Sequence, residues 1–366
     1  MSFKLLKETE AGIRQGKLKT AHGQIKTPLY LPDATRGFLK LLTTKEIKTT
    51  GTEALVVNTF HLYLQPGLEV IKRAGGIHRF MNWPGVLISD SGGFQIFSLI
   101  HSQAQLGEVS DQGAIFKSPL DGSRHEISPE KSIQIQFDLG VDAMICLDDC
   151  PANDFSEADL KRSVDRTIAW AKRSKLEYER QIVARGLTGL QRPLLFAVIQ
   201  GGENLVLRKY CATELVKLGF AGYGFGGSPI DTTGKFMSKM LKETAKLIPQ
   251  ESLRFALGIG TLADIKRSAK LGWDLFDCVI PTREGRHGRL FLPSQQRLKT
   301  INISNTRFKK NFQAINPLSQ LPELRNNHLA FLHHLFKLQE PLGQRLASLN
   351  NLEAYQKLIT DLRQTK

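Results

Sequence analysis

The feature that most constrains the fold is a regular alternation between short apolar runs and helical patterns. Eight runs rich in β-branched and aromatic residues recur along the chain, at residues 29–34, 54–60, 85–91, 143–149, 194–200, 222–227, 254–260 and 275–281. Helical patterns lie between several of them, at residues 128–140, 156–181 and 262–272. Strands that alternate with helices in this way predict a parallel sheet built from βα units.

Chain length decides between the two folds that such a sheet permits. Eight βα units fill roughly 250 residues as a closed barrel and leave room for insertions, and the chain has 366 residues. We therefore expect an α/β fold, a (β/α)8 TIM barrel, with an open doubly wound sheet as the alternative. Residues 107–128, with a turn at Asp121-Gly122, predict an inserted β-hairpin. The alternation fades beyond the eighth run, so we expect the barrel in residues 1–295 and a small helical C-terminal appendage, packed on it, in residues 296–366.

Polar residues gather where the predicted strands end. They are Asp90, Asp148, Asp149, Gln200, Gly226, Gly227 and Asp277. The carboxyl ends of barrel strands converge on one mouth, where the active sites of such barrels lie. Taken singly, each acid can equally well cap the next helix or hold a turn. Carboxylates from three or four strands together favour a functional site at the mouth.

The net charge favours a polyanionic partner. The chain carries 50 Lys and Arg against 35 Asp and Glu, a formal charge of +15. Nucleic acid leads the partners that such an excess suggests, and a basic, solvated surface without a partner is the alternative. Directly after Asp277, residues 282–289 concentrate three arginines and a histidine.

Membrane and secretory classes are disfavoured by the absence of long apolar runs. No run reaches the roughly 18 residues that a span needs, and the first residues lack a signal-peptide core. We therefore expect no membrane partner and a cytoplasmic protein. The four cysteines, Cys146, Cys150, Cys211 and Cys278, are too few for a disulfide framework. Cys146 and Cys150 lack a second Cys or His cluster, which makes them a weak zinc candidate.

Five motifs together carry a family resemblance. They are VNTFHLYLQPG (57–67), ISDSGGFQIFSL (88–99), AVIQG (197–201), GIGTLADI (258–265) and FDCVIPTR (276–283). In this order they resemble the tRNA-guanine transglycosylases, also called queuine tRNA-ribosyltransferases, over about residues 25–360. The resemblance implies an enzyme that replaces a guanine of tRNA with a 7-deazaguanine base and leaves the phosphate backbone intact.

The substrates and partners follow from the same resemblance. It implies tRNAs with a GUN anticodon, for aspartate, asparagine, histidine and tyrosine, whose wobble guanine is exchanged in queuosine biosynthesis. The incoming base is 7-aminomethyl-7-deazaguanine in bacterial relatives and queuine in eukaryotic ones. Family members act as homodimers.

Two acids match the catalytic pair of the family. By resemblance Asp277 is the nucleophile and Asp90 the general acid/base. Breaking an N-glycosidic bond builds oxocarbenium character at C1′, which a carboxylate can trap as a covalent aspartyl-ribose ester. The departing guanine needs a proton and the incoming base must lose one, and one carboxyl group with a raised pKa can serve both directions.

The base-binding residues are also implied by the resemblance. Asp148 faces the amino and ring N–H groups of the base, and Gln200 with the amide of Gly227 holds its carbonyl. Phe94 stacks on one face of the base and Leu257 covers the other, although Phe94 can also be an ordinary core aromatic. The remaining residues of this set, Ser91, Gly92 and Gly93, permit a close backbone approach.

Two further segments match RNA-contacting loops. The first is Gly258, Ile259, Gly260, Thr261, Leu262, Ala263 and Asp264, and the second is Thr282, Arg283, Glu284, Gly285 and Arg286. Arginine forks bind phosphate or a guanine edge bidentately. Such contacts offset the cost of taking the target base out of its stack. Glu284-Gly285 stands where relatives commonly have Asn-Ala, and the sequence offers no account of it.

The sequence departs from the family at the zinc site. Relatives hold a structural zinc with three cysteines and a histidine, and the matching positions here are Ser319, Leu321, Leu324 and Asn350. All four ligands are missing, and apolar packing can hold such a segment without metal. We therefore expect no metal and no other cofactor.

A second departure follows Gly227. The glutamate that contacts the 7-substituent of the base is replaced by Thr232, although Asp231 could act in its place. Ile230 is bulky where eukaryotic relatives have glycine, which favours the smaller base.

Two other functions compete with an active transglycosylase. One is a paralogue with the same chemistry on another nucleic-acid target, such as DNA or a different tRNA position. The other is a non-catalytic tRNA-binding subunit that has lost its acids. The presence of both Asp90 and Asp277 argues against the second.

Overall fold

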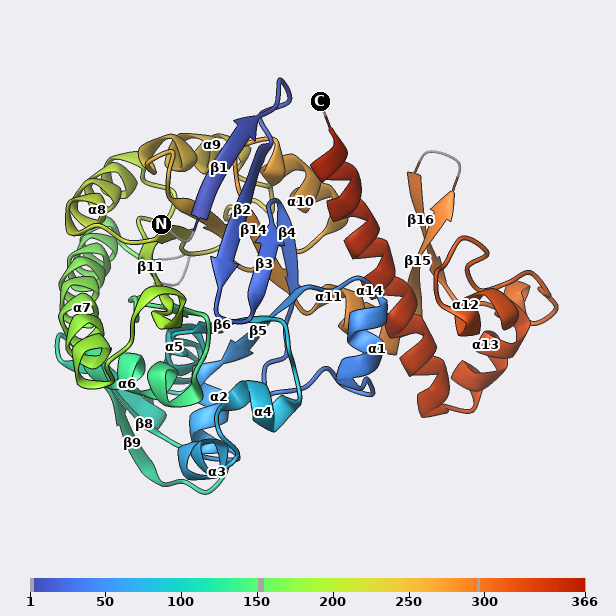
Figure 1. Ribbon diagram of the computed structural model, residues 1–366, viewed down its shortest axis with the longest axis horizontal. Coiled ribbons are helices and arrows are strands. Elements are labelled where there is room, and N and C mark those ends of the chain that lie inside the picture. Colours follow the sequence, from blue (N-terminus) through green and yellow to red (C-terminus); the bar gives the residue numbers. More distant parts are fainter. Residues whose placement is uncertain (1–2, 151–154, 295–296, 366) are drawn as a thin grey trace.

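The computed structural model describes residues 3–150, 155–294 and 297–365, and a parallel barrel forms its centre (Figure 1). Within these residues the barrel strands are β4 (Leu29–Pro32), β5 (Ala54–Asn58), β6 (Val86–Asp90), β10 (Ala143–Ile145), β11 (Leu194–Ile199), β12 (Gly222–Phe225), β13 (Leu253–Ala256) and β14 (Leu275–Cys278). They pair in parallel in the order β4-β14-β13-β12-β11-β10-β6-β5. A parallel bridge between Asp33 and Val56 joins β4 to β5 and closes the ring. The predicted (β/α)8 barrel is confirmed, and its strands coincide with the eight apolar runs.

Side-chain alternation separates an inner from an outer core. Along each strand every second residue points into the barrel, where it packs with the inward residues of the other strands. The inner set includes Leu29 and Leu31 of β4, and Val86 and Ile88 of β6. The residues between them, such as Leu87, pack outward against the helices.

Helices follow the strands and form the outer wall. They are α1 (Thr44–Thr49), α2 (Thr59–Leu64), α3 (Leu68–Arg73), α4 (Ile77–Met81), α5 (Gly93–Ser102), α6 (Pro129–Leu139), α7 (Glu157–Ala184), α8 (Leu205–Leu218), α9 (Ser238–Leu247), α10 (Leu262–Ala269) and α11 (Ile280–Arg286). The start of α6 follows from its sequence, since the hydroxyl of Ser128 accepts from the Lys131 amide at 3.2 Å and Pro129 occupies the first turn. The helix ends at Gly140, whose φ of +73° suits glycine. Among the described residues, no helix is long and apolar enough to cross a membrane.

The insertion between β6 and β10 contains one strand more than the predicted hairpin. β7 (Gly107–Ser110), β8 (Gly113–Lys117) and β9 (Arg124–Ile127) form an antiparallel sheet. The Asp121-Gly122 turn lies in the connection from β8 to β9, as expected. The extra strand, β7, arises because a second tight turn precedes β8.

A second antiparallel sheet covers the N-terminal end of the barrel, and the sequence analysis did not anticipate it. It consists of β1 (Phe3–Glu8), β2 (Arg14–Thr20) and β3 (Gly23–Lys26). In Figure 1 this sheet lies in front of the barrel strands, and Phe3, Leu18 and Ile25 pack into the inner core. The barrel is therefore plugged at this end.

Ion pairs fasten that sheet to the barrel. The Nε of Arg14 lies 3.0 Å from Oδ1 of Asp274, directly before β14, and both side chains are buried. Asp142, directly before β10, accepts from the Leu87 amide and faces His22 at 2.9 Å and His78 at 3.2 Å. Acids at this end of the barrel thus have cationic or hydrogen-bonding partners.

The C-terminal segment begins with strands and returns to the barrel wall. β15 (Arg289–Ser294) and β16 (Arg297–Asn302) form a hairpin, followed by α12 (Pro322–Asn326), α13 (Leu329–Lys337) and α14 (Pro341–Gln364). In Figure 1 the hairpin, α12 and α13 lie on the outer side of α14. Helix α14 packs on the barrel, since Tyr355 donates to the carbonyl of Gly260 at 2.7 Å and Arg363 pairs with Glu53 at 2.7 Å.

The positions that correspond to the family's zinc ligands lie where α14, which carries Asn350, contacts the segment of Ser319, Leu321 and Leu324. Leu321 and Leu324 are buried in the core. The amide of Asn350 accepts from Asn316 at 3.1 Å and donates to the carbonyl of Phe291 at 3.1 Å. Apolar packing and amide hydrogen bonds therefore join these elements.

Candidate active site

The strand alternation carries inward-pointing positions up to the carboxyl ends of the strands, and polar residues occupy them. Above the inner core, these positions are Asn58 on β5, Asp90 on β6 and Asp277 on β14, together with Asp33, Gln200 and Leu257, which directly follow β4, β11 and β13. Asn58 and Gln200 are buried, and the other four side chains are only partly exposed. Carboxylates in such a place are poorly solvated, which raises their pKa values.

Asp90 is held by three donors from neighbouring backbone and side chains. The amides of Thr59 and Gly92 each donate to Oδ1 at 3.1 Å, and Nδ2 of Asn58 donates to Oδ2 at 2.6 Å. Burial raises the pKa of Asp90 to about 7, the Thr59 amide opposes this, and the charge of Asp277 adds to it. The carboxyl group therefore exists in both protonation states near neutral pH.

Asp277 occupies the same layer on β14. Its Oδ1 accepts from the Gly258 amide at 2.8 Å. Burial raises the pKa of Asp277 to about 6 and the Gly258 hydrogen bond moderates the effect. Asp90 and Asp277 both occupy inward positions at the carboxyl ends of their strands, so the two predicted catalytic acids point toward the same mouth.

A third acid, Asp33, lies in the same cluster and was not singled out from the sequence. Burial raises its pKa well above the usual range, and the charges of Asp277 and then Asp90 raise it further. The sequence could have indicated it, since Asp33 lies in the first apolar run as Asp90 and Asp277 lie in the third and eighth. Asn58 and Thr59, which hold Asp90, were also missed.

The predicted base-binding residues Asp148, Gln200 and Gly227 are brought together on the opposite side of the mouth. Nε2 of Gln200 donates to Oδ2 of Asp148 at 2.6 Å, whereas Oε1 is buried without a hydrogen-bond partner. Burial raises the pKa of Asp148 to about 6, against the Gln200 hydrogen bond. A Cβ at Gly226 would lie 2.5 Å from Nε2 of Gln200, so glycine at this position leaves room for the Gln200 side chain. Gly227, at φ +85°, follows directly.

The Ser91-Gly92-Gly93 turn sits tightly against its neighbours. A Cβ on Gly92 would lie 2.8 Å from the backbone nitrogen of Phe60, and the φ of +78° also favours glycine. The hydroxyl of Ser91 accepts from the Gly93 amide at 3.2 Å. The glycines are thus required by protein packing around Asp90.

The two residues expected to flank a base differ in burial. Phe94 is 65% exposed, which rules out the core position that was its alternative. Leu257 is half-buried and packs over Gly224, where a Cβ would lie 2.8 Å from its Cδ1.

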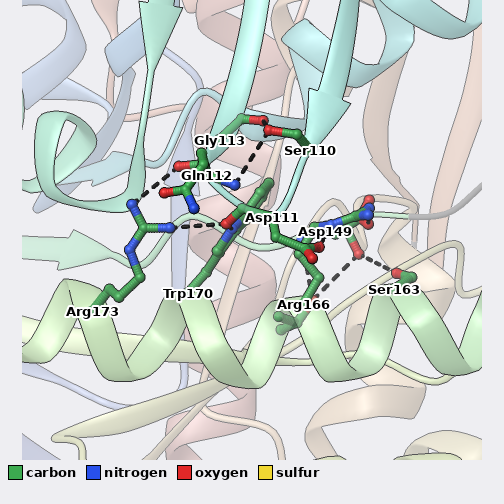
Figure 2. Close-up of polar contacts among 10 residues, drawn as sticks. Ser110, Asp111, Gln112, Gly113, Asp149, Ser163, Arg166, Trp170 and Arg173 are labelled. Carbon is green, nitrogen blue, oxygen red and sulfur yellow. Dashed lines mark hydrogen bonds and ion pairs between the residues drawn. The ribbon is translucent and has the colours of Figure 1, made fainter.

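Asp149, the strand-end acid beside Asp148, faces the helix wall. Figure 2 shows its pairing with Arg166 of α7, at 2.6 Å, and the hydrogen bond from Ser163 to its carbonyl at 2.7 Å. Arg166 also pairs with Asp111 of the inserted sheet at 3.0 Å, and Trp170 donates to the Asp111 carbonyl at 2.8 Å. Asp149 therefore ties the loop after β10 and the inserted sheet to α7.

The two predicted RNA-contacting segments share one groove of about 1130 Å³ beside α14. Thr261, Leu262 and Ala263 line it from the first segment, and Arg283 and Glu284 from the second. Within the first segment, Gly258 is exposed, Asp264 is half-buried, and Ile259 and Gly260 are buried.

Within the second segment, arginines face out and small residues face in. Arg283 is exposed and Arg286 half-buried, and burial and then the charge of Arg283 lower the pKa of Arg286. Thr282 and Gly285 are buried, and a Cβ on Gly285 would lie 2.8 Å from the backbone of Ser348 on α14.

Glu284, which the sequence left unexplained, is an ion-pair partner in the structure. Its carboxylate lies 3.0 Å from Arg289 and 3.7 Å from Arg283. Its negative charge is therefore balanced within the basic segment.

Comparison with known proteins gives one family across nearly the whole chain. The family model described as Queuine tRNA-ribosyltransferase matches residues 9–365. The chain is 39% identical over 364 residues to the "Queuine tRNA-ribosyltransferase" of Halothermothrix orenii, covering 99% of this chain and 93% of that protein. It is 39% identical over 364 residues to the protein of the same name from Blochmanniella pennsylvanica, with 100% and 94% coverage. For the one from Prochlorococcus marinus the identity is 38% over 339 residues, with 93% and 86% coverage.

The raised pKa of Asp277 predicts a pH-dependent cost in stability. Because the folded-state pKa, about 6, exceeds the unfolded value of about 3.9, the stability from the protonated carboxyl is full below about pH 4. It is lost as the pH rises through about 6. Asp277→Asn keeps an acceptor for the Gly258 amide but removes the titration. Between pH 4.5 and pH 8 the wild type should lose about 1–2 kcal/mol more unfolding free energy than the variant, measured in urea. Equal pH dependence of the two proteins would contradict this.

Proposed function

Since the chain belongs to the queuine tRNA-ribosyltransferase family, we propose that its barrel mouth carries out the exchange of guanine in tRNA for a 7-deazaguanine base. The protein is a tRNA-guanine transglycosylase, a pentosyltransferase of queuosine synthesis. The observation that carries the assignment of residues is the pair Asp90 and Asp277, which share one mouth with raised pKa values.

Asp277 is the nucleophile in this proposal. The Gly258 amide holds one oxygen of its carboxylate, at 2.8 Å, which leaves the other free to attack C1′ of the ribose. With a pKa of about 6 it is mostly ionised at neutral pH. Attack forms a C1′–oxygen ester as the C1′–N9 bond breaks, so the abasic RNA stays attached while the bases change places.

Asp90 moves the proton. Its pKa of about 7 allows it to protonate the departing guanine and then accept a proton from the incoming base. When Asp277 forms the ester its negative charge disappears, which makes it easier for Asp90 to ionise at the moment it gives up its proton. The contacts from Asn58, Thr59 and Gly92 stabilise the ionised carboxylate that results.

The base is recognised on the other side of the mouth. Asp148 would accept from the amino and ring N–H groups, and Gln200 and the Gly227 amide would donate to the carbonyl oxygen. The Gln200–Asp148 hydrogen bond of 2.6 Å prearranges this edge. The exposed ring of Phe94 and the side chain of Leu257 would cover the two faces, in contacts worth about 1–3 kcal/mol per base.

The tRNA contacts are proposed for the basic groove. Exposed Arg283 and half-buried Arg286 follow the nucleophile within nine residues, so they would meet the nucleotides beside the target base. We propose the wobble guanine of GUN anticodons as the target. The pairing of Glu284 with Arg289 keeps its charge from repelling phosphate.

A pocket of about 420 Å³ adjoins Gln200 and Gly227 and would receive the 7-substituent. Thr232 lines it where relatives have glutamate, and its amide donates to Oε1 of Glu203 at 3.1 Å. Asp231 instead accepts from Thr233 and Lys235 within its own loop. We therefore assign to Glu203, ahead of Asp231, the role of accepting from an amine on the substituent.

The residues at the family's zinc position do not fit a zinc ion, and we propose that the protein binds none. Structural zinc takes thiolates and imidazoles, whereas Leu321 and Leu324 offer no donor atom. Ser319 donates to Glu353 at 2.5 Å and Asn350 is engaged by Asn316. No step of the proposed mechanism involves a metal.

We also propose a homodimer, a cytoplasmic location, and a division into residues 1–295 and 296–366. The boundary at 295–296 lies outside the described residues. Large apolar side chains exposed on the C-terminal segment, Phe312 at 71% and Leu318 at 73%, support a protein contact there.

Exchange of radiolabelled guanine into unmodified tRNA with a GUN anticodon tests the assignment. Asp277→Ala should abolish incorporation, because no ester can form, and Asp90→Ala should lower it by at least about 100-fold. Glu243→Gln, which alters a surface carboxylate paired with Lys246 on α9, should leave it unchanged. Incorporation that survives Asp277→Ala would exclude this nucleophile. Labelling of DNA alone would favour the paralogue, and labelling of no nucleic acid the silent subunit.

Base competition tests the role of Glu203. Glu203→Gln should raise the KM for 7-aminomethyl-7-deazaguanine by about tenfold, since a charge-assisted hydrogen bond is lost, and leave guanine exchange nearly unchanged. Asp231→Asn is the matched comparison, because it alters the other acid of this loop. A larger effect from Asp231→Asn than from Glu203→Gln would reverse the assignment, and queuine in the same assay shows which base the pocket prefers.

Metal analysis tests the zinc proposal. Protein purified without chelator should contain far less than one zinc per chain, and a chelator should not change its Tm. Asn350→Ala, in contrast, should cost about 1–3 kcal/mol of unfolding free energy, because it leaves buried partners unsatisfied. One tightly bound zinc per chain would refute the proposal.

A further inference from the structure

Asp33 is the acid of the mouth that the proposed mechanism does not use, and the fold fixes where it points. Leu29 and Leu31 pack into the inner core, so Asp33, two residues further, points inward as well. Its backbone is held at the seam that closes the barrel, by the bridge to Val56 and by the Ala34 amide, which donates to the Val56 carbonyl at 2.7 Å.

The strand order places Asp33 on the sugar side of the site. Reading around the barrel, β14, β4, β5 and β6 carry Asp277, Asp33, Asn58 and Asp90 in one continuous arc. The residues proposed to hold the base come instead from β10, β11 and the loop after β12, on the other arc. Asp33 therefore lies between the proposed nucleophile and the proposed general acid, beside the sugar and away from the base.

The side chain of Asp33 is a free hydrogen-bonding group. Within the described part of the chain it makes no hydrogen bond and no ion pair, and the charges that act on it are those of Asp277 and Asp90. Burial and then these charges raise the pKa of Asp33 well above the usual range, which favours the protonated carboxyl group. A neutral carboxylic acid donates one hydrogen bond and accepts another.

We propose that Asp33 binds the 2′-hydroxyl of the target ribose and makes the enzyme select RNA over DNA at the exchanged nucleotide. The inference rests on the proposed function, since it takes Asp277 as the group that attacks C1′. Adjacent strands lie about 4.8 Å apart, so a side chain on β4 reaches groups bonded to the carbon that Asp277 attacks.

Two oxygens of the sugar lie near C1′, the ring oxygen and the 2′-hydroxyl, and their hydrogen-bonding properties indicate which one Asp33 binds. The ring oxygen only accepts hydrogen bonds, and a donor there would oppose the positive charge that develops on the ring. The 2′-hydroxyl both donates and accepts, which matches a carboxylic acid. Hydrogen bonds to the corresponding hydroxyl strengthen in the transition states of glycoside hydrolysis, and this hydroxyl distinguishes RNA from DNA.

Two RNA stem-loops that differ by one oxygen test the inference. Both carry a GUN anticodon loop, and one has 2′-deoxyguanosine at the exchanged position. With wild-type protein, the kcat/KM for the stem-loop, measured by incorporation of labelled guanine, should be at least about tenfold higher for the all-ribose substrate. This is the effect expected for one lost hydrogen bond. Asp33→Val, which cannot hydrogen-bond, should bring the ratio close to one. Asp33→Asn, which still donates and accepts, should keep most of the discrimination.

The ratio separates a sugar contact from a structural role. Glu243→Gln should show the wild-type ratio. If Asp33→Val slows both substrates by the same factor and leaves the ratio unchanged, or if Asp33→Asn loses discrimination as fully as Asp33→Val, the inference is overturned. Equal rates on both substrates with wild-type protein would overturn it while leaving the proposed function intact. Wild-type protein that labels neither substrate would overturn the proposed function as well.

Discussion

The two-residue alternation of the barrel strands is the constraint on which the rest of the structure depends. It sends every second residue inward, and in the strands that lead to the acids these residues are apolar until the last position. Leu29 and Leu31 precede Asp33, and Val86 and Ile88 precede Asp90. A one-residue slip of β4, β6 or β14 would turn its acid toward the helices. The packing that stabilises the barrel core therefore also orients the acids toward the mouth.

The acids at the two ends of the barrel have different partners. At the N-terminal end, Asp274 pairs with Arg14, and Asp142 faces two histidines. At the mouth, Asp90 and Asp277 have neutral donors but no cation within hydrogen-bonding distance among the described residues, and burial raises their pKa values. Hydrogen bonds from its neighbours lower the pKa of Asp142 despite its burial, whereas burial raises the pKa of Asp274 even beside Arg14. The acids at the mouth therefore ionise at a cost in stability, and their raised pKa values suit proton and ester chemistry near neutral pH.

Much of this could be predicted from the sequence, because apolar runs and strand ends are local signals. The eight strands and the convergence of Asp90 and Asp277 follow from them. Other features depend on contacts between distant segments. Asp33 was missed although it lies in the first apolar run, because its grouping with Asp277 depends on the pairing of β4 with β14, about 240 residues away in sequence. The N-terminal sheet has short strands with polar outer faces. Its apolar residues pack into the end of the barrel, so their role cannot be predicted without the barrel structure. The pairing of Glu284 with Arg289 needed the turn into β15.

Helix α14 links the C-terminal segment to the chemistry at the mouth. Asn351 donates to the carbonyls of Pro281 and Arg289, at 3.0 and 2.8 Å, and accepts from the Phe291 amide at 2.9 Å. It thereby fixes both ends of the segment that carries Arg283 and Arg286. Its neighbour Asn350 stands where relatives have a zinc ligand and holds Asn316 instead. If zinc is absent, as we propose, neighbouring amides on one helix take over the task of the metal, which is to keep the C-terminal segment against the basic loop. Such a clamp depends on every amide finding its partner, because an unsatisfied buried amide costs more than a lost surface contact. The RNA-binding face would then depend on the packing of α14, although that helix lies outside the catalytic mouth.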